Sequence, residues 1–239
     1  VVRFANALGY SGYPKLQDAL QEVIKNKLTT VQRLELSSDY ITEGHALKGV
    51  LKADMENIRA TMEKIDYNTF EDVVNNIFAA KRIYIIGLRS SMALAEFLGF
   101  YLNIILQNVK TVGYGISDIF EQMINVGEGD LVIGIGFPRY ASRTIDALAF
   151  AQDRGARVVA VTDSFLSPLA TRADYALIAQ SNMASFVDSL VAPLSVINAL
   201  IIAVGMREKD NISSTFNSLE EIWQEYNVYS YNNRNVGDD

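Results

Sequence analysis

The feature that most constrains the fold is a short apolar run, residues 83–87, that ends in a glycine and is followed by two serines. The run Ile-Tyr-Ile-Ile-Gly does not alternate between apolar and polar residues. Such a run is typical of a strand that is buried on both faces of a parallel sheet. The serines that follow, Ser90 and Ser91, precede a helical pattern that begins at Met92. The stretch therefore predicts a buried strand, a tight turn and a helix.

The same alternation continues along the chain. Further apolar runs are separated by helical patterns of apolar residues at 92–105, 117–125 and 142–151, and by a short helix opened by Ser167-Pro168. The runs that we expect to form strands are 109–114, 131–136, 157–162 and 174–179. Strands that alternate with helices at these lengths predict an α/β fold: a doubly wound parallel sheet in a flavodoxin-like three-layer sandwich, preceded by N-terminal helices.

Two loops follow strands of this predicted sheet. Residues 88–91 follow the first strand and residues 137–142 follow the 131–136 strand, so both loops emerge at carboxyl ends, where ligands of such sheets bind. Arg89, Ser90 and Ser91 would place a cation, two hydroxyls and backbone N–H groups at a helix N-terminus, which favours an anion. We expect a site for the phosphate of a small metabolite. The alternative is that these serines and Ser142 only cap helices.

A dinucleotide site is the obvious rival interpretation. The first turn lacks the second and third glycines that let a pyrophosphate approach the backbone, and the chain has no Walker-type glycine-lysine-threonine loop. Hydroxyls and an arginine in place of glycines favour a monophosphate.

Composition excludes several classes of site. The chain has no cysteine, so disulfides and thiolate metal sites are excluded, which suits a reducing cytoplasm. With His45 as its single histidine, the chain lacks the ligands for a histidine zinc site and offers little for a histidine-dependent catalytic triad. We interpret His45 as a surface or packing residue. The net charge of −7 argues against a protein that coats nucleic acid with its whole surface. We expect neither a metal nor another cofactor.

The N-terminal segment, residues 1–34, differs from the rest in charge. It carries five basic residues against two acidic ones, although the whole chain is acidic. Apolar residues at helical spacing predict one helix over residues 1–8, with Gly9 as its left-handed cap, and a second helix from Pro14 to about Leu28. The chain begins without methionine in what is predicted to be the middle of a helix, so we expect it to be a fragment.

This segment resembles a known family. The residues Val-Val-Arg-Phe at 1–4 and Leu-Gly-Tyr-Ser-Gly-Tyr-Pro-Lys-Leu at 8–16 are similar to the end of the helix-turn-helix domain of RpiR-type bacterial transcriptional regulators. The resemblance covers about the last third of that domain. It implies that Arg3 and Asn6 lie on the recognition helix, where they can reach phosphates or base edges of DNA.

A second resemblance covers residues 81–179. The strand, glycine and serine pair followed by a helix look like the start of a SIS domain, the sugar isomerase module, and the two pieces occur in the order of the RpiR family. The resemblance implies a phosphosugar sensor in which Ser90 and Ser91 contact the phosphate. The second phosphate loop departs from the Ser-x-Ser-Gly-x-Thr pattern of most SIS domains, and we expect Arg139, Tyr140 and Ser142 to supply its contacts.

Between these pieces we expect a linker and a connecting helix at residues 35–66, then the SIS domain at 67–228 and a disordered tail at 229–239. Residues 34–43 are polar and mixed. Residues 47–65 carry an apolar stripe of near-heptad spacing, which predicts a helix with a partner to pack on, and a second stripe covers 67–78.

Two more helices are expected near the C-terminus, over residues 185–206 and 213–227. The first is apolar on most sides but contains Asp188, Pro193 and Asn198, which favours a core or an interface over a membrane span. We therefore expect a homodimer or a higher homo-oligomer without membrane contact.

These patterns leave three functions open. The chain is expected to be a ligand-responsive transcription factor rather than an enzyme, and the second interpretation is an aldose–ketose isomerase on the same fold. An isomerase needs a base, for which the candidates are Glu96, Asp118, Glu121 and Asp163; we interpret them as helix-start or solvated charges. The third interpretation is a metabolite-binding scaffold without DNA contact.

Overall fold

The protein folds around a five-stranded sheet in which every neighbouring pair of strands is parallel. The computed structural model describes residues 2–17, 20, 28–37, 45–183 and 185–229. The strands are β1 (Ile83–Gly87), β2 (Val109–Val112), β3 (Leu131–Ile135), β4 (Arg157–Thr162) and β5 (Tyr175–Ile178), in the order β2-β1-β3-β4-β5. The predicted doubly wound α/β fold is confirmed.

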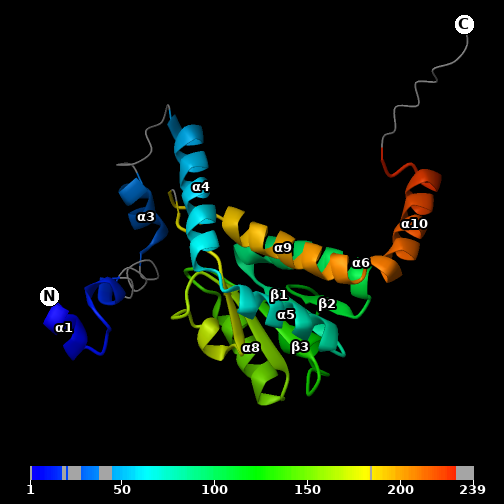
Figure 1. Cartoon of the computed structure of the whole chain (residues 1–239), viewed down its shortest axis with the longest axis horizontal. Coiled ribbons are helices and arrows are strands. Elements are labelled where there is room, and N and C mark those ends of the chain that lie inside the picture. Colours follow the sequence, from blue (N-terminus) through cyan, green and yellow to red (C-terminus); the bar gives the residue numbers. More distant parts are fainter. Residues whose placement is uncertain (1, 18–19, 21–27, 38–44, 184, 230–239) are drawn as a thin grey trace, which may run out of the picture.

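Helices cover both faces of the sheet and make a three-layer sandwich (Figure 1). One face packs against α5 (Tyr67–Ala79), α6 (Met92–Leu106) and α9 (Val191–Arg207), and the other against α7 (Ile119–Gln122) and α8 (Ser142–Asp153). Ile83 and Ile85 of β1 belong to the first core, whereas Tyr84 and Ile86 belong to the second. Because both cores are apolar, the strand carries no polar alternation.

The connecting helix α4 (Ala46–Lys64) forms as predicted, but it does not dock by its apolar stripe. Its buried polar residues are Asn57 and Thr61, which are 1% and 6% exposed. Asn57 exchanges two hydrogen bonds with the backbone of Asn182, and the Thr61 hydroxyl accepts from the N–H of Gln180 at 2.8 Å. Of the stripe, Ile65 at the C-cap packs against the core. The other members face outward, with these large side chains 40–76% exposed: Leu47, Val50, Leu51, Met55, Ile58 and Met62. Within the described residues the expected packing partner of the stripe is therefore absent.

The N-terminal helix α1 (Val2–Ala7) ends as the sequence predicts. Gly9 has a φ of 86°, and the N–H groups of Gly9 and Tyr10 donate to the carbonyls of Asn6 and Ala5, which is the Schellman pattern. Ala5 is buried, whereas Phe4 is 62% exposed, so the described part of the chain does not cover the whole expected apolar face. Residues 13–17 are helical and residue 28 is not; residues 18–19 and 21–27 of the second predicted helix lie outside the described residues.

A helix that the sequence interpretation missed, α3 (Thr30–Ser37), spans the predicted boundary at residue 34 between the N-terminal segment and the linker. The Thr29 hydroxyl accepts from the N–H of Gln32, and the Gln32 side chain accepts from the N–H of Thr29. This is a capping box, so the pattern Thr-x-x-Gln could have revealed the helix. The remainder of the expected linker up to residue 44 lies outside the described residues.

The C-terminal helices begin elsewhere than predicted. Helix α9 begins at Val191 rather than at 185, because Pro193 carries no N–H and is accommodated in the first helical turn. Helix α10 spans Lys209–Glu225, and a 3-10 turn, η3 (Ala170–Arg172), follows Ser167-Pro168. Of the expected tail, Tyr229 packs its ring against Trp223 at 5.1 Å, and residues 230–239 lie outside the described residues.

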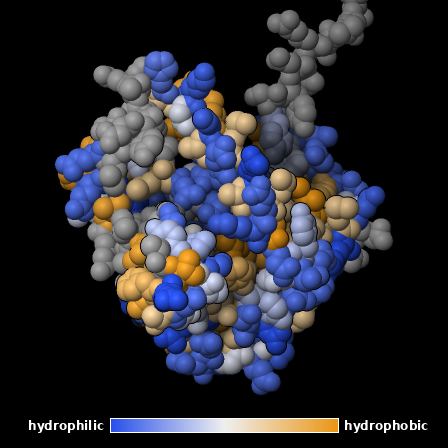
Figure 2. All heavy atoms as spheres, turned by 60° about the vertical axis from the view of Figure 1, so that its left-hand side comes forward, coloured by the Kyte–Doolittle hydropathy of each residue, from blue (hydrophilic) through white to orange (hydrophobic). Residues whose placement is uncertain are grey.

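Apolar patches interrupt a mostly hydrophilic surface on the face that Figure 2 shows. Within the described residues no single helix has the length and apolarity to span a membrane; α9 meets that test only together with residues 212–225, across a bend of 109°.

Candidate functional site

The turn after β1 folds back closely on the end of its strand. A Cβ on Gly87 would lie 2.6 Å from the carbonyl oxygen of Ser91, so the turn requires glycine here. The turn is a single 3-10 turn, η2 (Arg89–Ser91), and α6 follows at once. Arg89 has a φ of 58°, in the left-handed region that non-glycine residues rarely adopt.

The loop after β3 has the same peculiarity. Phe137 and Pro138 are buried, and Arg139 then turns outward with a φ of 65°. Ala141 follows in an extended conformation and is the N-cap of α8. Backbone strain of this kind concentrates at functional sites. Both loops at the carboxyl edge of β1 and β3 thus carry a strained arginine.

These two loops enclose a cavity of about 120 Å³, which we call the switch-point cavity. In the strand order observed here, successive strands are added on one side of β1 and then on the other, so the order reverses between β1 and β3. Ligands of such folds bind at that point. The cavity is lined by Leu88, Arg89, Ser90, Ser91, Ile135, Gly136, Phe137, Pro138, Arg139, Ala141 and Thr144, and by Arg33, Phe186 and Asp188 from outside the two loops.

The charges of the lining favour an anion. Three arginines, Arg33, Arg89 and Arg139, line the cavity together with one carboxylate, Asp188. The N-cap residues of α6 and α8, Ser91 and Ala141, also belong to the lining, and neither makes a side-chain cap hydrogen bond. Both helices therefore direct the positive ends of their dipoles at the cavity.

Two hydroxyl side chains in the lining are buried. Ser91 is 5% exposed and Thr144, in the first turn of α8, is 1% exposed. The Thr144 hydroxyl oxygen has no hydrogen-bond partner among the described residues. A buried hydroxyl without a partner costs free energy, so a ligand that bonds to it recovers that cost.

Helix α3 closes one side of the cavity. The Arg33 guanidinium is 2% exposed and donates to the Asp188 carboxylate at 2.8 Å. Arg139 donates to the Thr30 hydroxyl at 2.7 Å. Helix α3 is thus attached to the loop after β3 and to the segment before α9, both of which line the cavity.

The structure brings four of the six predicted effector residues to this cavity: Arg89, Ser90, Ser91 and Arg139. The other two are not in its lining. Tyr140 donates its hydroxyl to Asp163 at 2.7 Å, and Asp163 is not in the lining either. Ser142 is an exposed first residue of α8, and the expectation that it caps this helix is wrong, because the turn at Arg139 places Ala141 in the N-cap conformation.

Sequence interpretation missed Arg33, Thr144 and Asp188. Thr144 had a signal in its position, since it lies in the first turn of the helix that follows the expected phosphate loop. Arg33 and Asp188 had none, because they are 155 positions apart and meet only in the fold.

The carboxylates considered for isomerase chemistry lie elsewhere. Asp118 and Glu121 form the capping box of α7, and Asp118 also pairs with Arg143. Asp163 accepts from Tyr140, and Glu96 is exposed on α6. His45 is exposed at the start of α4. None of these belongs to the lining of the switch-point cavity, and the described residues contain no group of three or more potential metal ligands.

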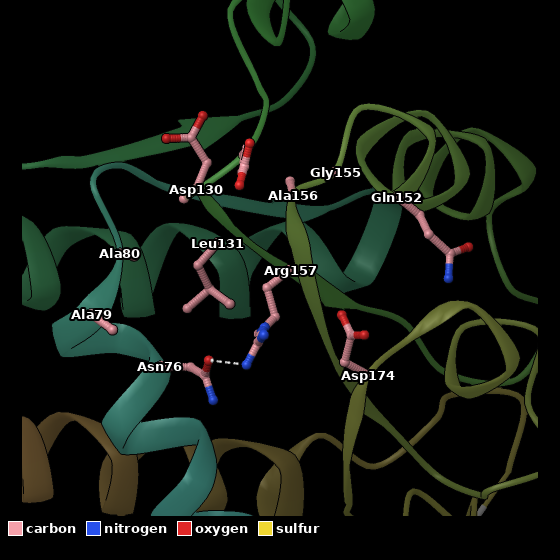
Figure 3. Close-up of a pocket in the computed structure, with 12 residues that line it drawn as sticks. Asn76, Ala79, Ala80, Asp130, Leu131, Gln152, Gly155, Ala156, Arg157 and Asp174 are labelled. Atoms are coloured by element: carbon pink, nitrogen blue, oxygen red, sulfur yellow. Dashed lines mark hydrogen bonds between the residues drawn. The ribbon is translucent and has the colours of Figure 1, made fainter.

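A larger cavity, of about 550 Å³, lies at the opposite edge of the sheet (Figure 3). There Arg157 points toward Asn76 of α5 and donates to it at 3.0 Å. Its lining holds three carboxylates, Glu128, Asp130 and Asp174, against one arginine, which disfavours a phosphate. Asp130 is moreover paired with Arg82, whose pKa is raised by this hydrogen bond.

Comparison with known proteins gives HTH-type transcriptional regulators and bifunctional glk proteins among the relatives. The chain is 28% identical over 183 residues to an HTH-type transcriptional regulator of Haemophilus influenzae, which covers 74% of this chain and 62% of that protein. It is 24% identical to another from Clostridium perfringens, with 74% and 63% covered. The chain thus spans less than two thirds of the length of these relatives. A bifunctional protein glk of Burkholderia is 26% identical over 74% of this chain and 27% of that protein.

Solved structures of similar fold include transcriptional regulators as well. The sugar isomerase domain of an RpiR transcription factor from Sphaerobacter thermophilus is similar with a TM-score of 0.71 and 29% identity, over 74% of this chain and 99% of that one. The Vibrio vulnificus NanR protein, complexed with ManNAc-6P, shares the fold with a TM-score of 0.62 and 19% identity, over 95% of this chain and 80% of that one. The resemblance to RpiR-type regulators is confirmed by these similarities. The SIS domain family matches residues 76–203, which is more than half of the chain, and the chain therefore belongs to the SIS domain family.

Proposed function

We propose that this chain is the sensing part of an RpiR-type transcriptional regulator of sugar metabolism, in which a phosphosugar effector binds the switch-point cavity and modulates DNA binding. The observation that carries the proposal is the cavity itself. It combines an excess of guanidinium groups, two helix N-termini and a buried hydroxyl that has no partner among the described residues, at the point of the sheet where ligands of this fold bind.

The effector class follows from this chemistry. A phosphate monoester brings up to two negative charges, which suits three arginines and one aspartate. We assign its contacts to Arg89, Ser90, Ser91 and Arg139, with Thr144 as a further hydrogen-bond partner. The structurally similar NanR is complexed with ManNAc-6P, a compound of the same chemical class.

DNA binding is proposed for the whole protein, of which α1 supplies a small part. Arg3 and Asn6 are exposed on α1, so both side chains are accessible to a duplex. The relatives of this chain are named as HTH-type regulators, which supports a helix-turn-helix head. The effector shifts DNA binding only if it has unequal affinity for two arrangements of that head.

We further propose that the chain forms a homodimer through the exposed apolar stripe of α4. Contiguous apolar surface of this kind on a folded domain marks an interaction site. The near-heptad spacing of the stripe predicts a partner helix, and the α4 helix of a second copy of the chain would be that partner. A regulator that binds bacterial DNA acts in the cytoplasm, which is the location we propose.

The competing function, an aldose–ketose isomerase, is disfavoured by the chemistry of the lining. Proton transfer between neighbouring carbons needs a base within hydrogen-bond reach of the substrate. The carboxylate in the lining is Asp188, and it is held in an ion pair by Arg33. We therefore propose a binding function without turnover. Isomerase turnover of a simple phosphosugar that Glu121→Gln abolishes would overturn this.

The proposal is tested by a thermal-shift screen of sugar phosphates against this chain, followed by calorimetry of each compound that raises Tm. Ser91→Ala should lower the affinity for such a compound severalfold or more. Its cost in stability should be small, because Ser91 makes no cap hydrogen bond. Ser142→Ala is the matched control, since it removes the same hydroxyl from an exposed position outside the cavity. No stabilisation by any sugar phosphate, or equal affinities for wild type and Ser91→Ala, would contradict the assignment.

A further inference from the structure

We propose that Arg33 of α3 is itself a ligand of the effector's phosphate, so that effector binding holds α3 against the SIS domain. The proposal rests on the proposed function and adds a residue from outside the SIS domain to its site. Helix α3 lies on the same flank of the molecule as α1, opposite to α10 (Figure 1). A ligand of α3 therefore acts on the part of the chain that leads to the DNA-binding head.

The first argument is the burial of the Arg33 side chain. It is 2% exposed although α3 is a short helix at the periphery, and it lines the switch-point cavity together with the strained turns after β1 and β3. A buried guanidinium is costly unless anions compensate it. A guanidinium presents five N–H donors in a planar fork, so Arg33 can bond Asp188 and a phosphate oxygen together.

The second argument is that the segment carrying Asp188, the ion-pair partner of Arg33, is fixed to the rest of the molecule. The segment that carries Asp188 is attached to α4, since Ser189 donates to Asp54 at 2.6 Å and Asn57 bonds the backbone of Asn182. A phosphate between Arg33 and the loops after β1 and β3 would thus join α3 to a rigid frame. The coupling is reciprocal. If DNA binding also holds α3 in this position, then DNA raises the affinity for the effector by the same factor by which the effector raises the affinity for DNA.

The proposal makes opposite predictions for the two partners of the ion pair. If Arg33 binds the phosphate, Arg33→Ala removes a charge-assisted ligand and should lower the affinity for inorganic phosphate about tenfold or more. Asp188→Asn removes the anion that competes with phosphate and should raise that affinity severalfold. If Arg33 only anchors the segment around Asp188, both variants break the same contact and should weaken binding alike.

The experiment is calorimetric titration of this chain with inorganic phosphate, for wild type, Arg33→Ala, Asp188→Asn and two controls. Arg59→Ala removes the same charge from an exposed position on α4 and should bind as wild type does. Ser91→Ala reports on the proposed function independently. Hydrogen exchange at the amides of residues 30–37 gives a second measurement: phosphate should slow it in wild type and in Asp188→Asn but not in Arg33→Ala.

The outcomes separate the two proposals. If wild type binds phosphate and Ser91→Ala weakens it, while Arg33→Ala behaves like Arg59→Ala, the role of Arg33 is refuted and the proposed function stands. If Arg33→Ala and Asp188→Asn both weaken binding, Arg33 is an anchor and not a ligand. If wild type does not bind phosphate, or if phosphate leaves the hydrogen exchange of α3 unchanged, the role of Arg33 is refuted. If wild type binds no sugar phosphate either, the proposed function is refuted too.

Discussion

Replacing Thr144 by valine should stabilise the ligand-free protein and weaken effector binding at the same time. The side chain is 1% exposed and its hydroxyl has no partner among the described residues. An unsatisfied buried hydroxyl costs about 1–3 kcal/mol, and valine has nearly the same shape without it. We expect a gain of about 1 kcal/mol in the free energy of unfolding, which for a chain of this size raises Tm by roughly 2–4 °C.

Effector affinity should move the other way. A hydrogen bond to a charged group contributes about 1.5–3 kcal/mol, so its loss lowers affinity about tenfold or more. The assay is a thermal melt with and without the best sugar phosphate, followed by calorimetry. Thr144→Val should show a higher Tm alone and a smaller rise with ligand.

Two controls make this result specific. Ser181 is a second buried hydroxyl without a partner among the described residues, and it lies outside the switch-point cavity, so Ser181→Ala should leave the affinity unchanged. Thr144→Ser keeps the hydroxyl and should keep most of the affinity. The reasoning would be refuted by a Thr144→Val protein that is less stable than wild type, or that binds the effector equally well.

Three further predictions concern the turn, the interface and a helix cap. Gly87→Ala should destabilise the fold by about 1–3 kcal/mol, because its Cβ would lie 2.6 Å from a backbone oxygen of the following turn; Gly115→Ala, where a Cβ meets no atom within 4 Å, is the control, and equal chemical-denaturation curves would contradict the close approach. Met55→Glu should leave the chain folded by circular dichroism, since the side chain is 70% exposed, but should convert a dimer to a monomer in sedimentation; an unchanged mass would exclude this face as the interface. Hydrogen bonds from Thr69 lower the pKa of Asp66 below its ordinary value of 3.8, so the capped form of α5 is favoured above about pH 4 and this stabilisation is lost as pH falls through the lowered pKa. The Tm difference between wild type and Asp66→Ala should therefore shrink at acid pH, and a difference that grows there would refute the cap.

Much of the fold was predictable because its signals are local. The run at 83–87 indicates burial on both faces, and the structure divides its side chains between two cores. The observed strand ends differ from the predicted ones by one or two residues, as at β2, because local patterns constrain the ends of elements only weakly. Helix α9 shows where a local pattern misleads. Apolar residues before Val191 continue the helical spacing, but Pro193 fits only in the first turn of a helix, so the helix begins just before it.

The orientation of α4 was not predictable in the same way. Its periodicity correctly indicates a helix, but the face it turns to the SIS domain carries Asn57 and Thr61 rather than the leucine and methionine stripe. Those polar groups dock because the backbone of residues 180–182 offers them hydrogen-bond partners. A preference for partners that are more than a hundred positions away leaves no trace in local spacing.

The sequence by itself determined the layers of this protein, the two loops at the carboxyl edge of β1 and β3, and the residues Ser90, Ser91, Arg89 and Arg139 in them. These follow from hydrophobic periodicity and turn chemistry, which act over a few residues. Only the tertiary structure decided that Thr144 is buried with no partner in the part of the chain that the structure describes, that Tyr140 bonds Asp163 outside the cavity, and that α3 brings Arg33 to the cavity wall. The physical reason is that burial and ion pairing depend on which distant segments share a volume, and that is settled by packing of the whole chain.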